Sequence, residues 1–283
     1  VVITIDSIEL RRKGGNDCDA DTATDDCVFI DQFTEDGEDT DTIQVDLLTL
    51  QGGDNKIIIE GLALEAGEYD QLRLSVNDED TNFSWVKEFE NGDVLKELKV
   101  PSDELKLGGF TLESAGVQVF VIEFDLRKAM TYNPGPDRYI LKPTGVRVVD
   151  VEAAASISGT VDSGLFIGNS SVPCVDKNDV NVGNVIYLYL GHSLATDNLA
   201  DNFDSILDVN APDTAIAPYT SQTVAADGSY AISSLPAGNY TLAFSCQAAN
   251  DDPDILDGIA IPAPETEIVE LSLGEGESNS CNF

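Results

Sequence analysis

One stretch of the chain brings together residue types that could do nucleophilic chemistry. Residues 184–195, NVIYLYLGHSLA, run from an apolar segment into Gly191, His192 and Ser193, which is close to the G-x-S-x-G nucleophile elbow. A serine hydroxyl needs a base to take its proton, and in the hydrolase order that histidine follows the serine. His192 is the only histidine, it precedes Ser193, and Ala195 stands where the second glycine belongs. We therefore expect a strand that ends in a turn, and no enzyme.

Carboxylates are the second group of residues that could do chemistry. The loop NDCDADTATDDC (16–27) places aspartates at alternate positions, as an EF-hand loop begins, but Thr22 replaces its glycine and Val28 its bidentate glutamate. A disulfide-closed loop of oxygen ligands could still bind Ca²⁺ loosely, and a solvated acidic surface is the competing interpretation. The predicted ligands are Asp17, Asp19, Asp21, Asp25 and Asp26. Ca²⁺ is the only cofactor that we expect.

Three further acidic stretches could also bind Ca²⁺. They are TEDGEDTD (34–41), DNLADNFDSILD (197–208) and NDDPDILD (250–257). For each of them a solvated surface is again the competing interpretation.

The charge of the chain excludes several classes of partner. Its 283 residues carry 52 acidic and 15 basic side chains, a net charge of −37. Nucleic acids and anionic membrane surfaces need cationic patches on their partners, so we exclude both. No stretch is long and apolar enough for a transmembrane helix, and no signal peptide is visible. Beyond residue 150 the only basic residue is Lys177, so the second half has almost no cation for ion pairs.

The cysteines indicate an oxidising compartment. The chain has five, at 18, 27, 174, 246 and 281, and none forms a C-x-x-C pair. Cys18 and Cys27 flank a polar loop of suitable size for a local disulfide. Cys246 ends a strand-like run and is expected to pair with Cys174 or with Cys281; the sequence does not choose between them. Disulfides of this kind predict an extracytoplasmic protein, at the cell surface or secreted.

The hydrophobic pattern predicts strands almost throughout. Alternation of apolar and polar residues begins at Ile3 in VVITIDSIEL, and Asn91-Gly92 between two alternating runs predicts a hairpin over 84–100. Other predicted β segments lie at 42–50, 55–64, 69–76, 109–114, 117–126, 139–151, 156–163, 185–190, 221–246 and 259–273. Helix is limited to a turn or two in FDLRKAMTY and DNFDSILDV. The predicted fold class is therefore all-β.

A repeated turn supports two β-sandwiches. Leu64-Glu-Ala-Gly67-Glu-Tyr69 and Leu235-Pro-Ala-Gly238-Asn-Tyr240 each precede a strand. Glycine suits a turn with positive φ, and a tyrosine at such a corner can bond its hydroxyl to nearby backbone. With the small residues at 152–156 as a linker, we predict two tandem antiparallel sandwiches of Greek-key or immunoglobulin-like type, over 1–151 and 156–283.

The second part resembles the carboxypeptidase-regulatory-like, or prealbumin-like, β-sandwich. The match covers about 156–273 and includes SGTV (158–161), NVIYLYL, then ADGSY (226–230) with AISSLPAGNYTLAF, and ETEIVELSL. It departs from the family in a long insertion, 191–220, rich in aspartate and asparagine.

The first part resembles a family of bacterial cell-surface lipoprotein domains of unassigned function. The matching segments are VVITIDSIEL, VDLLTL, LEAGEYDQLRLSV, VPSDELKLGGFTLESAG and YILKPTGVRVV. The resemblance implies export and a lipid anchor, although no lipidated cysteine lies near Val1. It also implies an opening strand that is not present before Val1. A sandwich without that strand would expose unpaired backbone groups and invite strand addition, through Val1, Val2, Ile3 and Ile5 of the first strand.

These observations lead to one function and one alternative. We expect a non-enzymatic structural or adhesive protein of the cell surface, which assembles into filaments by strand addition and associates with itself or with other surface proteins. The alternative is a surface module that binds Ca²⁺ or glycans.

Overall fold

The computed structural model contains almost no helix. It describes residues 1–35, 37–50, 54–89, 91–113, 117–168, 174, 177 and 179–283, and within them the one α-helix, α1 (Leu126–Ala129), is a single turn. The chain is therefore all-β, as the sequence predicts. No helix in these ranges is long and apolar enough to cross a bilayer. The chain divides into two compact units: unit 1 is 1–124 with 129–150, and unit 2 is 125–128 with 151–283.

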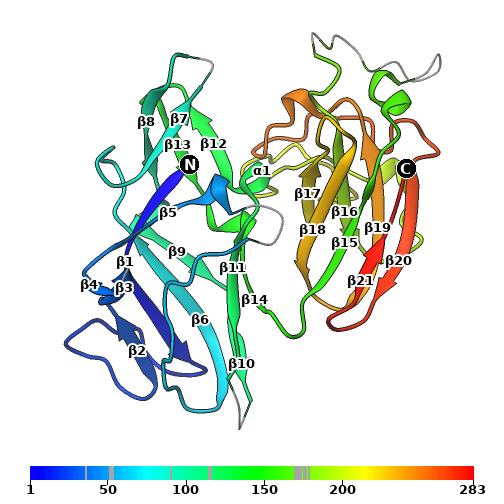
Figure 1. The fold of residues 1–283 in the computed structure, drawn as a ribbon. Helices are drawn as coiled ribbons and strands as arrows, with labels where there is room; N and C mark the ends of the chain where they lie inside the picture. The colour runs from blue at the N-terminus through cyan, green and yellow to red at the C-terminus, as the bar shows by residue number, and fades with distance from the viewer. Residues whose placement is uncertain are drawn as a thin grey trace. The chain divides into compact units, whose positions relative to one another are not determined.

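Unit 1 is built around one long strand, β1 (Val2–Arg12) (Figure 1). In its main sheet the strand order is β10-β6-β1-β7-β8-β13-β12, with β2 and β5 also paired to β1 and β9 to β6. These strands are β2 (Cys27–Ile30), β5 (Ile43–Asp46), β6 (Gly67–Val76), β7 (Trp85–Glu88), β8 (Val94–Lys99), β9 (Glu104–Leu107), β10 (Phe110–Leu112), β12 (Met130–Asn133) and β13 (Arg138–Leu141). Two smaller pairs are β3 (Phe33–Glu35) with β4 (Glu38–Thr40), and β11 (Phe120–Phe124) with β14 (Val146–Asp150).

The first strand has neighbours on both sides, which corrects an expectation from the sequence. Ile5 pairs with Ile43 of β5 and with Val76 of β6, and Ile8 pairs with Ile30 of β2 and with Leu74 of β6. Seven of its eleven residues are buried, and they include neighbours whose side chains point to opposite faces of the sheet. The backbone groups that we assigned to assembly at Val1, Val2, Ile3 and Ile5 thus belong to a central strand and offer no open edge.

The hydrophobic alternation of β1 slips by one residue in its middle. Ile3 and Ile5 are buried before the slip, Ile8 and Leu10 after it, and the polar pair Asp6-Ser7 lies between. The register with β6 shifts between Ile5 and Ser7. A β-bulge of this kind keeps both apolar sets on the core side while it bends the strand.

Unit 2 is a sandwich of two short sheets. One has the order β18-β15-β21, and the other has the order β17-β16-β19-β20. The strands are β15 (Ala155–Thr160), β16 (Val185–Leu190), β17 (Thr220–Thr223), β18 (Ser229–Leu235), β19 (Gly238–Ser245), β20 (Ile268–Leu273) and β21 (Ser278–Ser280). One cluster of buried residues, which includes Ile157, Leu188, Ile232, Leu242 and Phe244, draws on both sheets. A second buried cluster, which includes Tyr187, Tyr189 and Leu199, lies on the other face of β16.

The first and last strands of unit 2 lie side by side and run parallel. Ser156 pairs with Ser278 and Ser158 with Ser280. The pairing continues past β21, where the N–H of Cys281 donates to Ser158 O and the N–H of Phe283 to Thr160 O, both at 2.9 Å. A Cβ on Gly159 would lie 1.6 Å from Cys281 O, so only glycine permits this close approach.

Both repeated turns form the tyrosine corners that the sequence predicts. Tyr69 donates its hydroxyl to Glu65 O (3.0 Å), and Tyr240 donates to Pro236 O (2.5 Å). Both rings are fully buried. The two glycines differ in backbone conformation. Gly67 has a φ of 142°, whereas the φ of Gly238 is not positive. The prediction of positive φ thus holds only for the turn of unit 1.

Candidate functional site

The turn that could have formed a nucleophile elbow is fixed by main-chain contacts. Gly191 and Ser193 both have positive φ, 102° and 55°. His192 Nε2 lies 2.9 Å from the carbonyl oxygen of Leu271 in β20, and the N–H of Ser193 donates to the carboxylate of Glu270. These contacts attach the end of β16 to β20. They give His192 and Ser193 a structural role that matches their sequence-based interpretation as a strand running into a turn.

The loop with the predicted Ca²⁺ ligands uses its carboxylates internally. Asp17 accepts a hydrogen bond from Arg11 and forms an ion pair with Arg73, each at 2.6 Å. Hydrogen bonds from Arg73 and then Arg11 hold the pKa of Asp17 below its ordinary value. Asp19 accepts the hydroxyl of Thr22 at 2.7 Å, which likewise lowers the pKa of Asp19.

The five predicted ligands do not form a cluster. Asp21, Asp25 and Asp26 are exposed. Over the described ranges, the one set of metal-ligand side chains within reach of a common ion is Glu9, Cys18 and Cys27, and these two cysteines are joined to each other. Asp17, Asp19, Asp21, Asp25 and Asp26 are thus not gathered around one point in this structure, and Ca²⁺ binding by the loop stays a prediction. Of the loop at 34–41, Asp36 lies outside the described residues.

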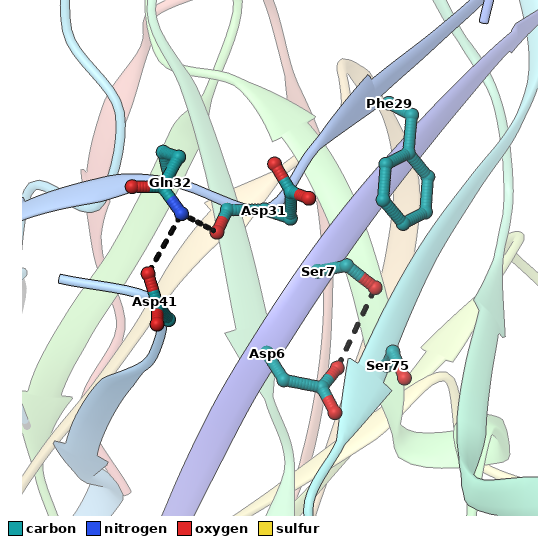
Figure 2. Close-up of a pocket in the computed structure, with 7 residues that line it drawn as sticks. All are labelled: Asp6, Ser7, Phe29, Asp31, Gln32, Asp41 and Ser75. Carbon is teal, nitrogen blue, oxygen red and sulfur yellow. Dashed lines mark hydrogen bonds between the residues drawn. The ribbon is translucent and has the colours of Figure 1, made fainter. Parts of the chain in front are cut away.

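A hollow of about 520 Å³ opens at the bulge of β1 (Figure 2). Here β1 exchanges one neighbour for another, since Ile5 pairs with β5 and Ile8 with β2. The hollow is wide and mostly polar, with one aromatic ring. Its lining consists of Asp6, Ser7, Phe29, Asp31, Gln32, Asp41 and Ser75. The side chain of Gln32 bridges two of its neighbours, because its Nε2 donates to Asp31 O (3.0 Å) and to Asp41 Oδ1 (2.8 Å).

In unit 2, two acidic loops are attached to each other through carboxylates. Asp251 is the centre of the first contact, with its side chain 1% exposed. Asp251 Oδ2 accepts hydrogen bonds from Arg127 (2.9 Å), from the hydroxyl of Tyr187 (2.8 Å) and from Asn202 Nδ2 (2.7 Å). Asp251 Oδ1 accepts the backbone N–H of Asn202 at 3.2 Å. Burial raises the pKa of Tyr187 well above its ordinary value, so its hydroxyl keeps the proton that it donates.

The second contact between these loops is Asp201, which is fully buried. Its two carboxylate oxygens accept the N–H groups of Asp257 (3.2 Å) and Ile259 (2.8 Å). Burial raises the pKa of Asp201 to about 6, and the negative charge of Asp251 adds to the shift. A third aspartate, Asp208, accepts the N–H of Leu256 at 2.9 Å.

The stretches that the sequence offers as Ca²⁺ loops, 197–208 and 250–257, are thus neighbours in space. Three of their carboxylates, on Asp201, Asp208 and Asp251, accept backbone N–H groups of the opposite loop. We call the two segments, 199–216 and 251–259, the paired loops. Their aspartates hold the loops together, which is a different role from metal binding.

Lys177 is half-buried beside the core of unit 2. Its Nζ donates to Phe166 O (2.9 Å) and to Asn184 Oδ1 (2.5 Å). Desolvation lowers the pKa of Lys177 to about 8. The single basic residue of 151–283 therefore satisfies buried oxygens and does not neutralise the acidic surface.

The comparison with protein families matches residues 1–143, half of the chain, to a domain of unknown function, DUF4382. The chain belongs to the DUF4382 family. The match spans most of unit 1, including β1 and the hollow, and ends before residue 151, where the main part of unit 2 begins. No curated relative matches the chain.

Solved structures that resemble this DUF4382 protein do so only distantly. They include the Bacillus anthracis TIE protein (TM-score 0.23), the minor pilin GBS52 of Streptococcus agalactiae (0.21) and a streptococcal ancillary pilin (0.23), each at 9% identity and over 99% of this chain. The chain spans 30%, 81% and 60% of those chains, respectively. At such TM-scores the similarities carry no argument about function.

Each unit of the DUF4382 protein contains one disulfide. Cys18 is joined to Cys27 in unit 1, with Cα atoms 6.0 Å apart, and Cys174 to Cys246 in unit 2, at 5.6 Å. The second pairing is one of the two that the sequence leaves open. Cys281 is a buried free thiol, and burial raises its pKa, which makes it unreactive while the unit is folded.

Two features of the DUF4382 protein were missed by sequence reasoning. The hollow had a detectable signal, because the adjacent polar residues Asp6 and Ser7 interrupt the alternation of VVITIDSIEL and mark a bulge. The contact between the paired loops had none, since it depends on how segments about 50 residues apart, such as Asn202 and Asp251, meet in the fold.

Proposed function

We propose that the protein is a non-enzymatic structural or adhesive protein of an extracytoplasmic surface. The observation that carries the proposal is the disulfide in each of two all-β units. Disulfides persist in oxidising compartments and are rare in the cytosol. Each disulfide joins a loop to a strand: Cys27 begins β2, and Cys246 directly follows β19. Each therefore reinforces its own β unit.

The distribution of charge supports the same role. Residues 1–150 carry 33 acids and 14 bases and residues 151–283 carry 19 acids and one base, which gives −19 and −18. Such surfaces remain soluble and repel nucleic acid and anionic lipid. Partners that are attracted by charge are therefore expected to be neutral or cationic, whereas strand addition between copies would rely on backbone hydrogen bonds.

Filament formation by strand addition remains part of the proposal in a changed form. Because β1 is already paired on both sides, an incoming strand would have to add to the open edge of a sheet. In unit 2, β20 is such an edge, because it pairs with β19 alone among the described strands. Electron microscopy of the purified protein tests this. Filaments are expected, and they are expected to disappear when Ser272 is changed to proline, because in the register with β19 the N–H of Ser272 points toward the open edge of β20 and proline has no N–H.

The location of the protein is tested in its native cells. We expect mild protease treatment of intact cells to remove it, and alkylation without reduction to label a single cysteine of the unfolded chain, Cys281. Labelling of all five cysteines in freshly trapped material, or protection from protease until the cells are lysed, would contradict an extracytoplasmic role.

The hollow in unit 1 favours a second function, glycan binding. Its carboxylates, amide and hydroxyls around the ring of Phe29 offer hydrogen-bond partners and an apolar surface in one open site (Figure 2). A glycan array with the wild type and with Phe29→Ala tests it. Binding that requires Phe29 is expected, and equal signals from both proteins would refute it.

A further inference from the structure

The paired loops present large aliphatic side chains to solvent. Ile206 and Val209 are each 83% exposed, Leu207 is 56% exposed and Ile255 is 48% exposed. They lie close together, because the first three are within one turn of chain and the carboxylate of Asp208 accepts the N–H of Leu256, next to Ile255. We call these four residues the aliphatic patch. Single exposed aliphatic residues are common, whereas four in one place mark an interaction site.

The patch is held in a defined conformation. The two ends of its loop meet where Leu199 bridges to Ile216, and the N–H of Ala200 donates to Ile216 O at 3.0 Å. Within the loop, Asp204 Oδ1 accepts the N–H of Ile206 (2.9 Å). Below the loop, Asp201 and Asp251 connect it to the opposite segment. A preorganised loop loses little conformational entropy when it binds.

A small hollow of about 320 Å³ adjoins the patch. Its lining is about equally polar and apolar and comes from the same loop: Phe203, Ser205, Asp208, Val209, Ala211, Pro212, Asp213 and Ala215. A hollow of this size beside exposed aliphatic residues can accept an apolar side chain of a partner, which is how buried anchors dominate interface energy.

The surroundings of the patch are acidic. Asp213 lines the hollow, and Asp252, Asp254 and Asp257 lie in the opposite loop. After Lys177 the sequence contains no lysine or arginine. The potential around the patch is therefore negative, and it favours cationic groups on whatever binds there.

We propose that the aliphatic patch is a docking site for a protein segment that carries aliphatic side chains flanked by lysine or arginine. The proposal rests on the proposed function, for which it names the partner. Charge selects this occupant: a second copy of the chain brings another −37, and an anionic lipid surface is repelled as well. The apolar contact supplies affinity, and the acidic surroundings supply orientation and specificity.

The test uses the full chain and two synthetic amphipathic peptides of one length, made of leucine with lysine or of leucine with glutamate. Their binding is measured by fluorescence anisotropy at about 0.15 M salt and at 1 M salt, where charges are screened within roughly 3 Å. The variant is Ile206→Ser/Val209→Ser. The matched control is Ile57→Ser, a 66% exposed isoleucine of unit 1.

We expect the leucine–lysine peptide to bind and to retain measurable affinity at 1 M salt. The double variant should weaken that binding by roughly tenfold or more, because two aliphatic contacts are lost, while Ile57→Ser leaves it unchanged. Equal affinity of wild type and double variant overturns the proposal, as does equal binding of the leucine–glutamate peptide. Patch-dependent binding to neutral phosphatidylcholine vesicles without peptide binding also overturns it, in favour of lipid.

The outcomes separate the patch from the proposed function. A cytosolic location with patch-dependent peptide binding refutes the surface role alone. A surface location with a double variant that binds like the wild type refutes the docking site alone.

Discussion

The two units carry similar excess negative charge and accommodate it in different ways. In unit 1 the carboxylates pair with cations: Arg11 lies between Asp17 and Asp70, and Lys99 contacts Asp78 and Asp103. In unit 2 most carboxylates with a partner accept backbone N–H groups. Examples are Asp162 to Gly164, Asp201 to Ile259, Asp204 to Ile206, Asp208 to Leu256 and Asp252 to Asp254.

This difference follows from the distribution of basic residues. A carboxylate without a cation can still be stabilised by an N–H two residues ahead, as in an Asx turn, or by an N–H of a neighbouring loop. Such bonds hold loops in place and depend on the backbone, whereas surface ion pairs contribute little to stability and weaken in salt. We therefore expect the units to respond differently to mutation, reduction, pH and salt.

Each unit has its own spectroscopic or chemical reporter. The only tryptophan, Trp85, lies in β7 of unit 1, and the only free thiol, Cys281, is buried in unit 2. Trp85 fluorescence in urea therefore follows unit 1, and labelling of the Cys281 thiol follows unit 2.

The largest effect is expected from Asp251→Ala. The change removes the buried carboxylate that pairs with Arg127 and accepts from Tyr187 and Asn202, so the free energy of unfolding of unit 2 should fall by about 3–5 kcal/mol. Thiol labelling of Cys281 in urea measures it. The control Asp213→Ala removes an exposed carboxylate and should change stability by less than about 0.5 kcal/mol. A loss in Asp251→Ala no larger than in the control contradicts a central role for Asp251.

Removal of the disulfides should affect unit 2 more than unit 1. Cys174 and Cys246 are 72 residues apart and Cys18 and Cys27 are 9 apart. By the entropy of loop closure, the pair Cys174→Ser/Cys246→Ser should cost unit 2 about 4 kcal/mol, and Cys18→Ser/Cys27→Ser should cost unit 1 about 3 kcal/mol. Urea denaturation of the two double variants checks the order. The reverse order would indicate that chain entropy does not govern the difference.

A decrease in pH should stabilise unit 2 and leave unit 1 nearly unchanged. Burial raises the folded-state pKa of Asp201 to about 6, above its unfolded value near 4. The folded state therefore binds the proton more tightly, and this stabilisation is present below about pH 4 and lost as pH rises through 6. Between pH 7 and pH 5 the gain should reach at most about 2 kcal/mol.

In unit 1 the shifts have the opposite direction. Hydrogen bonds from cations lower the pKa of Asp17, Asp70 and Asp137, so these groups lose their contribution only when pH falls below about 4. Urea curves at pH 7 and pH 5 measure both units, and Asp201→Asn is the control that should remove the gain in unit 2. Destabilisation of unit 2 at pH 5, or an unchanged gain in Asp201→Asn, would contradict the assignment to Asp201.

Salt should produce the smallest difference. Between about 0.05 M and 0.5 M NaCl, screening relieves repulsion among like charges in both units, but in unit 1 it also weakens attractive ion pairs. Unit 2 should gain more stability than unit 1, by an amount on the order of 1 kcal/mol or less. Thermal unfolding followed by Trp85 fluorescence for unit 1 and by Cys281 labelling for unit 2 compares the two gains in stability. An equal gain would show that the ion pairs of unit 1 contribute nothing measurable.

The sequence predicts local features well because they depend on neighbouring residues. The apolar run of β16, the hairpin β7–β8 around Asn91-Gly92 and the tyrosine corners at Tyr69 and Tyr240 all form as expected. The run at 55–64 is different, because its described residues form no strand and Ile57 is 66% exposed. β-branched residues favour a strand only where a partner strand is available.

The candidate sites were less predictable because their chemistry depends on distant contacts. An aspartate that binds Ca²⁺ and an aspartate that accepts the N–H two residues ahead look alike in sequence. Asp19 and Asp204 each accept the N–H two residues ahead. The central position of β1 also depends on strands from four later segments. The segment DNFDSILDV was expected to hold a helical turn, and its exposed Ile206 and Val209 could not be foreseen from periodicity.

The parallel pairing of β15 with β21 has a mechanical consequence. A pull that separates residue 155 from residue 283 acts along both strands in opposite directions, so the hydrogen bonds between Ser156 and Phe283 are loaded in shear and must break together. An antiparallel pair pulled from one end would open like a zipper, one bond at a time. Unit 2 should therefore resist a pull between these two residues with several hydrogen bonds at once.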